Sequence, residues 1–159
     1  MAYDRIKLFE EMERQFESKN GQYFKKLLNH HDVVVRTRAV CILADIAGVN
    51  AIKSIGRVLK DDDNTLVRHE AAFSLGQLGY TSGIAALADA VRSDPSFFVR
   101  HEAAVALGVI GSEEARKTLD AALKDESEEV RESAVVALAN LDYIRSTNSN
   151  SRFTKMTGG

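Results

Sequence analysis

Apolar side chains recur at intervals of three and four residues along most of this chain, and short polar or glycine-containing breaks separate the runs. This spacing is typical of helices that bury one face. Residues 3–18 carry one such stripe, and a shorter one follows from Tyr23 to Leu28, beyond a break at Ser18–Gly21. The pattern predicts two N-terminal helices that cover the open end of a larger helical stack.

A repeated dipeptide shows how the rest of the chain is built. Four of the Val-Arg dipeptides, at residues 35–36, 67–68, 99–100 and 130–131, are spaced at intervals of 32, 32 and 31 residues. Each copy is followed by an alanine-rich stretch and then, in the first three units, by a second apolar stripe. Four copies of a unit too short to bury its own apolar face predict a solenoid of stacked helical hairpins. We expect one all-α domain at 1–143, with an N-terminal helical cap at 1–31 and about four hairpin repeats at 32–143.

Polar residues mark the expected starts of the repeat helices. Asn64 or Thr65, Ser96 and Ser127 precede apolar runs, and their side-chain oxygens can accept hydrogen bonds from the free N–H groups of a first helical turn. The polar stretch 144–159 lacks the apolar side chains needed to order itself. We expect it to be a disordered tail.

Composition narrows the function classes. The chain has 159 residues, enough for one domain with a core. Its 21 Lys and Arg and 23 Asp and Glu are interspersed, with a net charge of −2, so we expect no nucleic-acid partner. Cys41 stands alone within an apolar pattern, where we expect a small buried residue and no disulfide. Charged residues near the N-terminus and the lack of a long uncharged apolar run favour a soluble, cytoplasmic protein without a membrane partner.

The two central repeats differ from the outer ones in a way that the fold does not require. Residues 67–79 and 99–111 are nearly the same sequence, and both continue Val-Arg with His-Glu, at His69-Glu70 and His101-Glu102. The outer repeats have Thr37-Arg38 and Glu132-Ser133 at these positions. The His-Glu pairs are therefore candidates for function.

In a solenoid these equivalent positions form parallel rows. Neighbouring helix axes lie about 8–10 Å apart, and metal–histidine bonds are about 2.0–2.1 Å long, so two imidazoles from adjacent helices can close on one metal. Two histidines with a carboxylate and open positions suit non-haem iron(II). The candidate ligands are His69, Glu70, His101 and Glu102. The alternative is that these are polar residues at helix starts, where Glu is favoured by the helix dipole without further purpose.

The Val-Arg, Ala-Ala and Leu-Gly-x-x-Gly positions resemble the short HEAT-like repeats of phycobilisome lyases. The resemblance covers roughly Asp32 to Tyr143, and Leu75–Gly79 is one of its clearest segments. It implies a HEAT-like α-solenoid.

A second resemblance concerns function. The acidic run 61–63 with Arg68-His69-Glu70 and Val99–Ala103 resembles one half of deoxyhypusine hydroxylase. This resemblance implies a di-iron monooxygenase that uses O2 to hydroxylate the deoxyhypusine side chain of a translation initiation factor. The ligand motif of that family, two His-Glu couples in two facing halves, maps here onto His69, Glu70, His101 and Glu102 alone.

The chain carries one couple where that family has two. A twofold homodimer could rebuild a centre of four histidines and four glutamates, because a symmetric interface presents the same patch from both subunits. Iron would then be the cofactor, O2 the co-substrate and a hypusine-type translation factor the partner. Glu132, in register with the two histidines, could attract a cationic amine; the alternative is a solvated carboxylate at a helix start. Otherwise the chain binds one metal ion or none.

Two non-enzymatic functions remain open. Solenoids mainly offer extended binding surfaces, which favours a protein–protein interaction scaffold. The phycobilisome lyase relatives favour a lyase-like or chaperone-like helper. The fold alone does not select among these functions.

Overall fold

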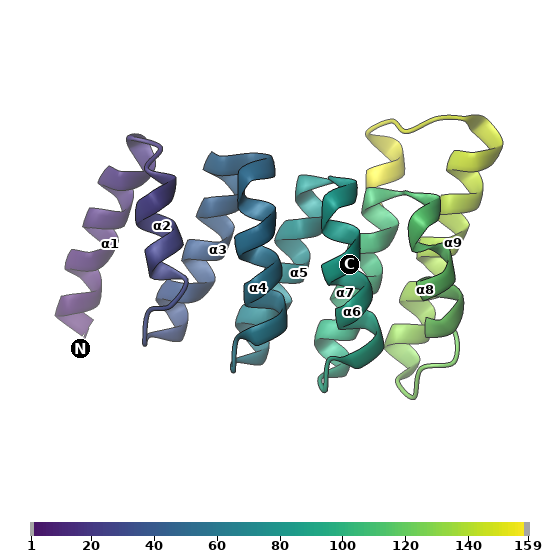
Figure 1. The fold of residues 1–159 in the computed structure, drawn as a ribbon, viewed down its shortest axis with the longest axis horizontal. Helices are drawn as coiled ribbons and strands as arrows, with labels where there is room; N and C mark the ends of the chain where they lie inside the picture. Colours follow the sequence, from purple (N-terminus) through teal and green to yellow (C-terminus); the bar gives the residue numbers. More distant parts are fainter. Residues whose placement is uncertain (1, 158–159) are drawn as a thin grey trace.

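The computed structural model describes residues 2–157, with side chains from Arg5 onward, and these residues form helices and no strand (Figure 1). The confirmed architecture is an all-α solenoid. The α-helices are α1 (Ala2–Glu17), α2 (Gly21–Leu27), α3 (Val33–Ala47), α4 (Ile52–Asp61), α5 (Thr65–Leu78), α6 (Ile84–Ser93), α7 (Phe97–Ile110), α8 (Arg116–Ala122) and α9 (Glu128–Thr147). Short 3-10 turns lie at Gly48–Ala51, Thr81–Gly83, Glu113–Ala115 and Phe153–Lys155.

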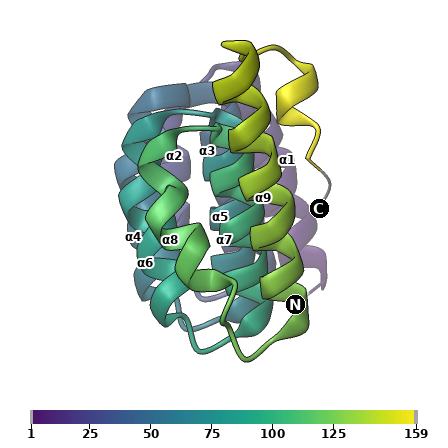
Figure 2. The ribbon, with the colours of Figure 1, turned by 90° about the vertical axis from the view of Figure 1, so that its right-hand side faces the viewer.

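The helices stand in two layers. Figure 2 shows α4, α6 and α8 on one side and α3, α5, α7 and α9 on the other. Three repeats are complete hairpins, α3/α4, α5/α6 and α7/α8, whereas the fourth Val-Arg unit contributes the single long helix α9. The core lies between the layers, and its fully buried side chains include Leu43, Ile55, Leu75, Leu87, Leu107, Leu119 and Leu141.

Helix α5 shows how the repeat sequence sets its own boundaries. The Asn64 side chain accepts a hydrogen bond of 2.9 Å from the Leu66 N–H at the first turn, as expected. At the other end Gly79 adopts φ 71°, a left-handed conformation that a glycine tolerates without strain, and its N–H bonds the Leu75 carbonyl. Ser96 and Ser127 also occupy N-cap positions, but their hydroxyls make no capping bond.

Glycines set the spacing within the α3–α9 layer. A Cβ added to Gly76 would lie 2.8 Å from the Ala106 Cβ, and one added to Gly108 would lie 2.8 Å from the Ala137 Cβ. Real Cβ atoms do not approach one another so closely. At these points the backbone of a glycine on one helix is therefore in direct contact with an alanine side chain of the next, between α5 and α7 and between α7 and α9. Side chains that project from neighbouring helices are thereby brought within contact distance.

The Val-Arg arginines join each repeat to the next. Arg68 donates to the Asp94 carboxylate at 2.8 and 3.0 Å, and its third contact is the Asp62 carbonyl at 2.9 Å. Arg100 repeats the pattern with Asp125 at 2.9 Å and with the Asp94 carbonyl at 2.9 Å. The same carboxylates accept from the N–H groups of Ser96 and Ser127. These arginine bonds go to residues of the loops, and none of them involves the carboxylates of Glu70 or Glu102.

The segment 33–61 is a long apolar stretch near the N-terminus. Residues 33–61 are long and apolar enough, by length and composition alone, to cross a membrane. In the structure they are two helices, α3 and α4, separated by the turn at Gly48–Ala51, and Val40 and Leu43 on α3 are fully buried in the core. Cys41, expected to be buried, is instead exposed, because Val40, Leu43 and Ala44 take up the core face of α3.

The C-terminal segment differs from the expected disordered tail at 144–159. Helix α9 continues to Thr147, and residues 153–155 form a turn that lies against α7. The Asn140 amide donates to the Gly108 carbonyl at 2.9 Å and to the Thr154 carbonyl at 2.7 Å, and Thr154 is 1% exposed. A side chain from a distant part of α9 therefore orders a segment that lacks an apolar stripe. Residues 158–159 lie outside the described part of the chain.

Replacing Gly76 with alanine is expected to lower the free energy of unfolding by about 1–3 kcal/mol, because the new methyl group overlaps Ala106 and forces α5 and α7 apart. The gain of about 1 kcal/mol in helix propensity offsets only part of this. Urea denaturation measures the change. Gly21→Ala is the matched control, since its added Cβ would meet Leu43 and Ala47 at an ordinary 3.8 Å. Unchanged stability in Gly76→Ala would contradict the tight approach.

Removing Asp125 is expected to be far more costly than removing its neighbour Glu126. Both carboxylates contact Arg100, but the Asp125 side chain is 12% exposed and that of Glu126 is 86% exposed. Asp125→Ala leaves a buried guanidinium without its main partner, at a cost of roughly 3 kcal/mol, whereas Glu126→Ala should cost less than about 1 kcal/mol. Equal losses in thermal unfolding would refute this role.

The same pair predicts a pH dependence. Burial by itself would raise the pKa of the Asp125 carboxyl, but hydrogen bonds from Arg100 and the Ser127 N–H outweigh it and hold the pKa below the ordinary 3.8. The unfolded chain therefore binds a proton at this carboxyl more readily than the folded chain does. The stabilisation by ionised Asp125 is complete above the unfolded-state pKa and is lost as the pH falls through the lower, folded-state pKa. The stability difference between the parent and Asp125→Ala should therefore shrink in strong acid.

Candidate metal centre

The two His-Glu pairs interact across helices. His69 on α5 places Nε2 3.3 Å from Oε2 of Glu102 on α7. One repeat further on, His101 places Nδ1 2.7 Å from the Ser133 hydroxyl on α9. In both cases the histidine position of one repeat contacts the glutamate position of the next repeat, which is occupied by Glu102 on α7 and by Ser133 on α9. The glycine contacts between these helices make this pairing possible.

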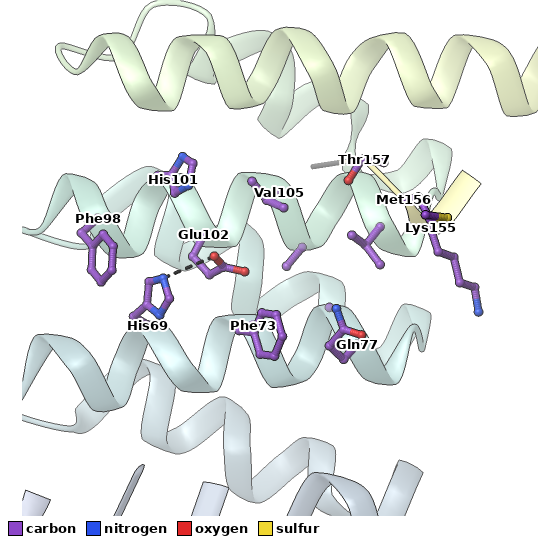
Figure 3. Close-up of a pocket in the computed structure, with 13 residues that line it drawn as sticks. His69, Phe73, Gln77, Phe98, His101, Glu102, Val105, Lys155, Met156 and Thr157 are labelled. Atoms are coloured by element: carbon purple, nitrogen blue, oxygen red, sulfur yellow. Dashed lines mark ion pairs between the residues drawn. The ribbon is translucent and has the colours of Figure 1, made fainter. Parts of the chain in front are cut away.

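The imidazole of His69 is held on two sides. The Phe98 ring stacks on it with centroids 4.0 Å apart and planes inclined by 8°. Figure 3 shows the His69 ring directed from α5 toward Glu102, with Phe98 beside it. The stacked ring covers one face of the imidazole and leaves its edge turned toward the carboxylate.

Glu102 is a buried carboxylate, with a side chain 8% exposed. Among the described residues its one ion-pairing contact is His69, which carries a charge only when protonated. A buried carboxylate is costly unless a cation or hydrogen-bond donors compensate for it. The position is therefore suited to a positively charged group between α5 and α7.

Glu70 lies in a different environment. Burial raises the pKa of its carboxyl, although His69 and a long contact of 3.5 Å from the Ser74 hydroxyl oppose the shift. Although Cys41 on α3 is exposed as a residue, partial burial of its thiol, followed by the negative charge of Glu70, raises the pKa of that thiol. Glu70 does not line the pocket that His69 and Glu102 share.

A cavity of about 440 Å³ brings three of the four predicted ligands together. His69, His101 and Glu102 line it from α5 and α7, with Phe73 and Phe98 beside them (Figure 3). Among the side chains that the structure describes, from Arg5 to Thr157, no three of His, Cys, Asp or Glu converge closely enough to form a metal-binding cluster. His101 is turned toward Ser133, so the described arrangement joins the predicted ligands by a shared pocket rather than by direct convergence.

Several residues that line this pocket or contact its histidines were not predicted from the sequence. Ser133 could have been found, because it stands at the same repeat position as Glu70 and Glu102. Phe98 precedes its Val-Arg dipeptide and carries no signal of a stacking role. Lys155, Met156 and Thr157 line the pocket from the C-terminal segment, and only the folding of that segment onto α7 brings them there.

Comparison with known proteins agrees with this architecture. The family model described as HEAT repeats matches residues 22–108 and 84–148, whereas no curated protein sequence matches. The solved structure of human deoxyhypusine hydroxylase in complex with glycerol is similar, with a TM-score of 0.75 and 30% sequence identity. The match covers 82% of this chain and 46% of the human chain. The chain belongs to the HEAT-repeat family, and its fold is similar to about one half of deoxyhypusine hydroxylase.

Proposed function

We propose that this chain binds iron at His69, His101 and Glu102 and acts as a non-haem oxygenase of the deoxyhypusine hydroxylase type. The observation that carries the proposal is the contact between His69 and the buried Glu102 carboxylate across α5 and α7. The fold does not need this pair, because the outer repeats lack it.

The donor set fits such an ion. Two ligand atoms that each lie about 2.1 Å from one metal ion, with a ligand–metal–ligand angle of about 90–109°, are about 3.0–3.4 Å apart. Nε2 of His69 and Oε2 of Glu102 are separated by 3.3 Å. His101 lines the same pocket and would supply the second imidazole. Two histidines, one carboxylate and open positions are a ligand set of oxygen-activating iron(II).

The surrounding residues have separate tasks in this proposal. Phe98 shields one face of His69 and limits the access of water to it. Glu70 was predicted to be a ligand; it does not line this pocket, and in this proposal we assign it a supporting role beside His69. Its raised pKa makes its carboxylate a better proton acceptor than an exposed glutamate. Bound iron would supply the binding and reduction of O2.

A second copy of the chain would supply the other half of a di-iron centre. The chain spans 46% of the length of the human enzyme chain, and a twofold dimer repeats the same patch on both subunits. Phe73 and Phe98 at the pocket are 43% and 40% exposed, which suits burial against a partner. An amine-bearing side chain of a hypusine-type translation factor in the cytoplasm is the proposed substrate, with Glu132 beside His101 as the group that attracts the amine.

The alternative is a scaffold that binds proteins without chemistry. Exposed apolar side chains on several helices favour it, including Ile6, Leu66, Phe97 and Val135. Metal content separates the two functions, because a scaffold needs no ion at His69 and Glu102.

Protein purified without chelator is expected to contain about one iron per chain, and His69→Ala, His101→Ala or Glu102→Ala should lose it while remaining folded. His30→Ala is the matched control, since His30 bonds the Asp32 N–H outside the pocket, and it should keep its iron. Elemental analysis measures the content, and solution mass reports whether the iron-loaded chain is a dimer. A metal-free monomer would refute the oxygenase and favour the scaffold.

A further inference from the structure

The hydroxyl of Ser133 makes two short contacts at once. Its Oγ lies 2.7 Å from His101 Nδ1 on the neighbouring helix. It also lies 2.7 Å from the Glu129 carbonyl of its own helix, to which it donates. Ser133 is 7% exposed, so water competes little for either contact.

The two contacts constrain where the protons are. A serine hydroxyl has one hydrogen and two acceptor lone pairs. Because the Glu129 carbonyl can only accept, it takes that hydrogen, and the Ser133 oxygen must then accept from His101. If Nδ1 carried no hydrogen, one of the two contacts would have to be given up. Both are satisfied only when His101 carries its hydrogen on Nδ1.

We infer that Ser133 is a positioning residue that holds neutral His101 as the Nδ1–H tautomer, with Nε2 unprotonated. Among the described residues, no hydrogen bond involves Nε2, and His101 also lines the pocket of His69 and Glu102. The lone pair of Nε2 is therefore free to bind a metal ion. This consequence, though not the tautomer itself, rests on the proposed function.

This arrangement gives a reason for the serine at the repeat position that Glu70 and Glu102 occupy in the two central repeats. Glu102 contacts the histidine of the preceding repeat, and Ser133 holds the equivalent place with respect to His101. A carboxylate at 133 would add a further negative charge beside His101. A hydroxyl instead orients the ring and fixes its tautomer without charge. Metal-binding histidines commonly donate their second N–H to such a group.

Nitrogen NMR of the labelled full chain, treated with chelator and held at pH 8, tests the tautomer directly. Ring nitrogen shifts distinguish protonated from unprotonated positions, and histidine is largely neutral at this pH. His101 in the parent should show a protonated Nδ1. Ser133→Ala should move the hydrogen toward Nε2, and Ser133→Thr, which keeps a hydroxyl, should restore the parent tautomer.

Ser93→Ala is the matched control. Ser93 donates to the Asp89 carbonyl at 2.8 Å on α6, so this change removes the same kind of helical hydroxyl bond away from His101 and should leave its tautomer unchanged. Anaerobic dialysis against Fe²⁺ gives the second measurement. Ser133→Ala should weaken binding by about 10–100-fold, and Ser133→Thr should recover it.

The outcomes separate the two proposals. A protonated Nε2 in the parent, or an unchanged tautomer in Ser133→Ala, overturns the role of Ser133 whether or not Fe²⁺ binds. The expected tautomers combined with no Fe²⁺ binding by the parent support the role of Ser133 in orienting His101 and overturn the proposed function.

Discussion

The close approach of α5, α7 and α9 is the constraint on which the candidate site depends. Gly76 and Gly108 lack the Cβ atoms that would collide with Ala106 and Ala137, so these helices pack more tightly than larger side chains would allow. At this spacing a histidine of one helix reaches the next helix. A wider separation would preserve a helical stack but would break the contacts of His69 with Glu102 and of His101 with Ser133.

The repeat divides structural and functional tasks between adjacent residues. In each central repeat the arginine of Val-Arg turns toward the loops, where it binds an aspartate of the loop that follows its own hairpin and a carbonyl of the preceding loop. The next two residues, His and Glu, project between the helices of the same layer. The arginine contacts can therefore recur along the stack, while the residues beside them vary from repeat to repeat and create one distinct pocket.

Much of the fold could be predicted because its determinants are local and periodic. Apolar spacing indicated the helices, and Val-Arg indicated the stack. The site was only partly predictable, because equivalent positions identify the rows but not which residues touch. His69 meets Glu102 rather than His101, and Glu70 lies outside the shared pocket. The order in the C-terminal segment depends on Asn140, fourteen residues from Thr154, which no local pattern reveals.

The central claim is that the pocket between α5 and α7 is an iron site. Crystals grown anaerobically with Fe²⁺ and measured at the iron absorption edge would locate the ion directly. The account predicts an anomalous peak in the pocket within about 2.0–2.2 Å of the ligand atoms of His69, His101 and Glu102. A peak elsewhere, for example at the adjacent His30 and His31, or no peak in well-diffracting crystals, would contradict it.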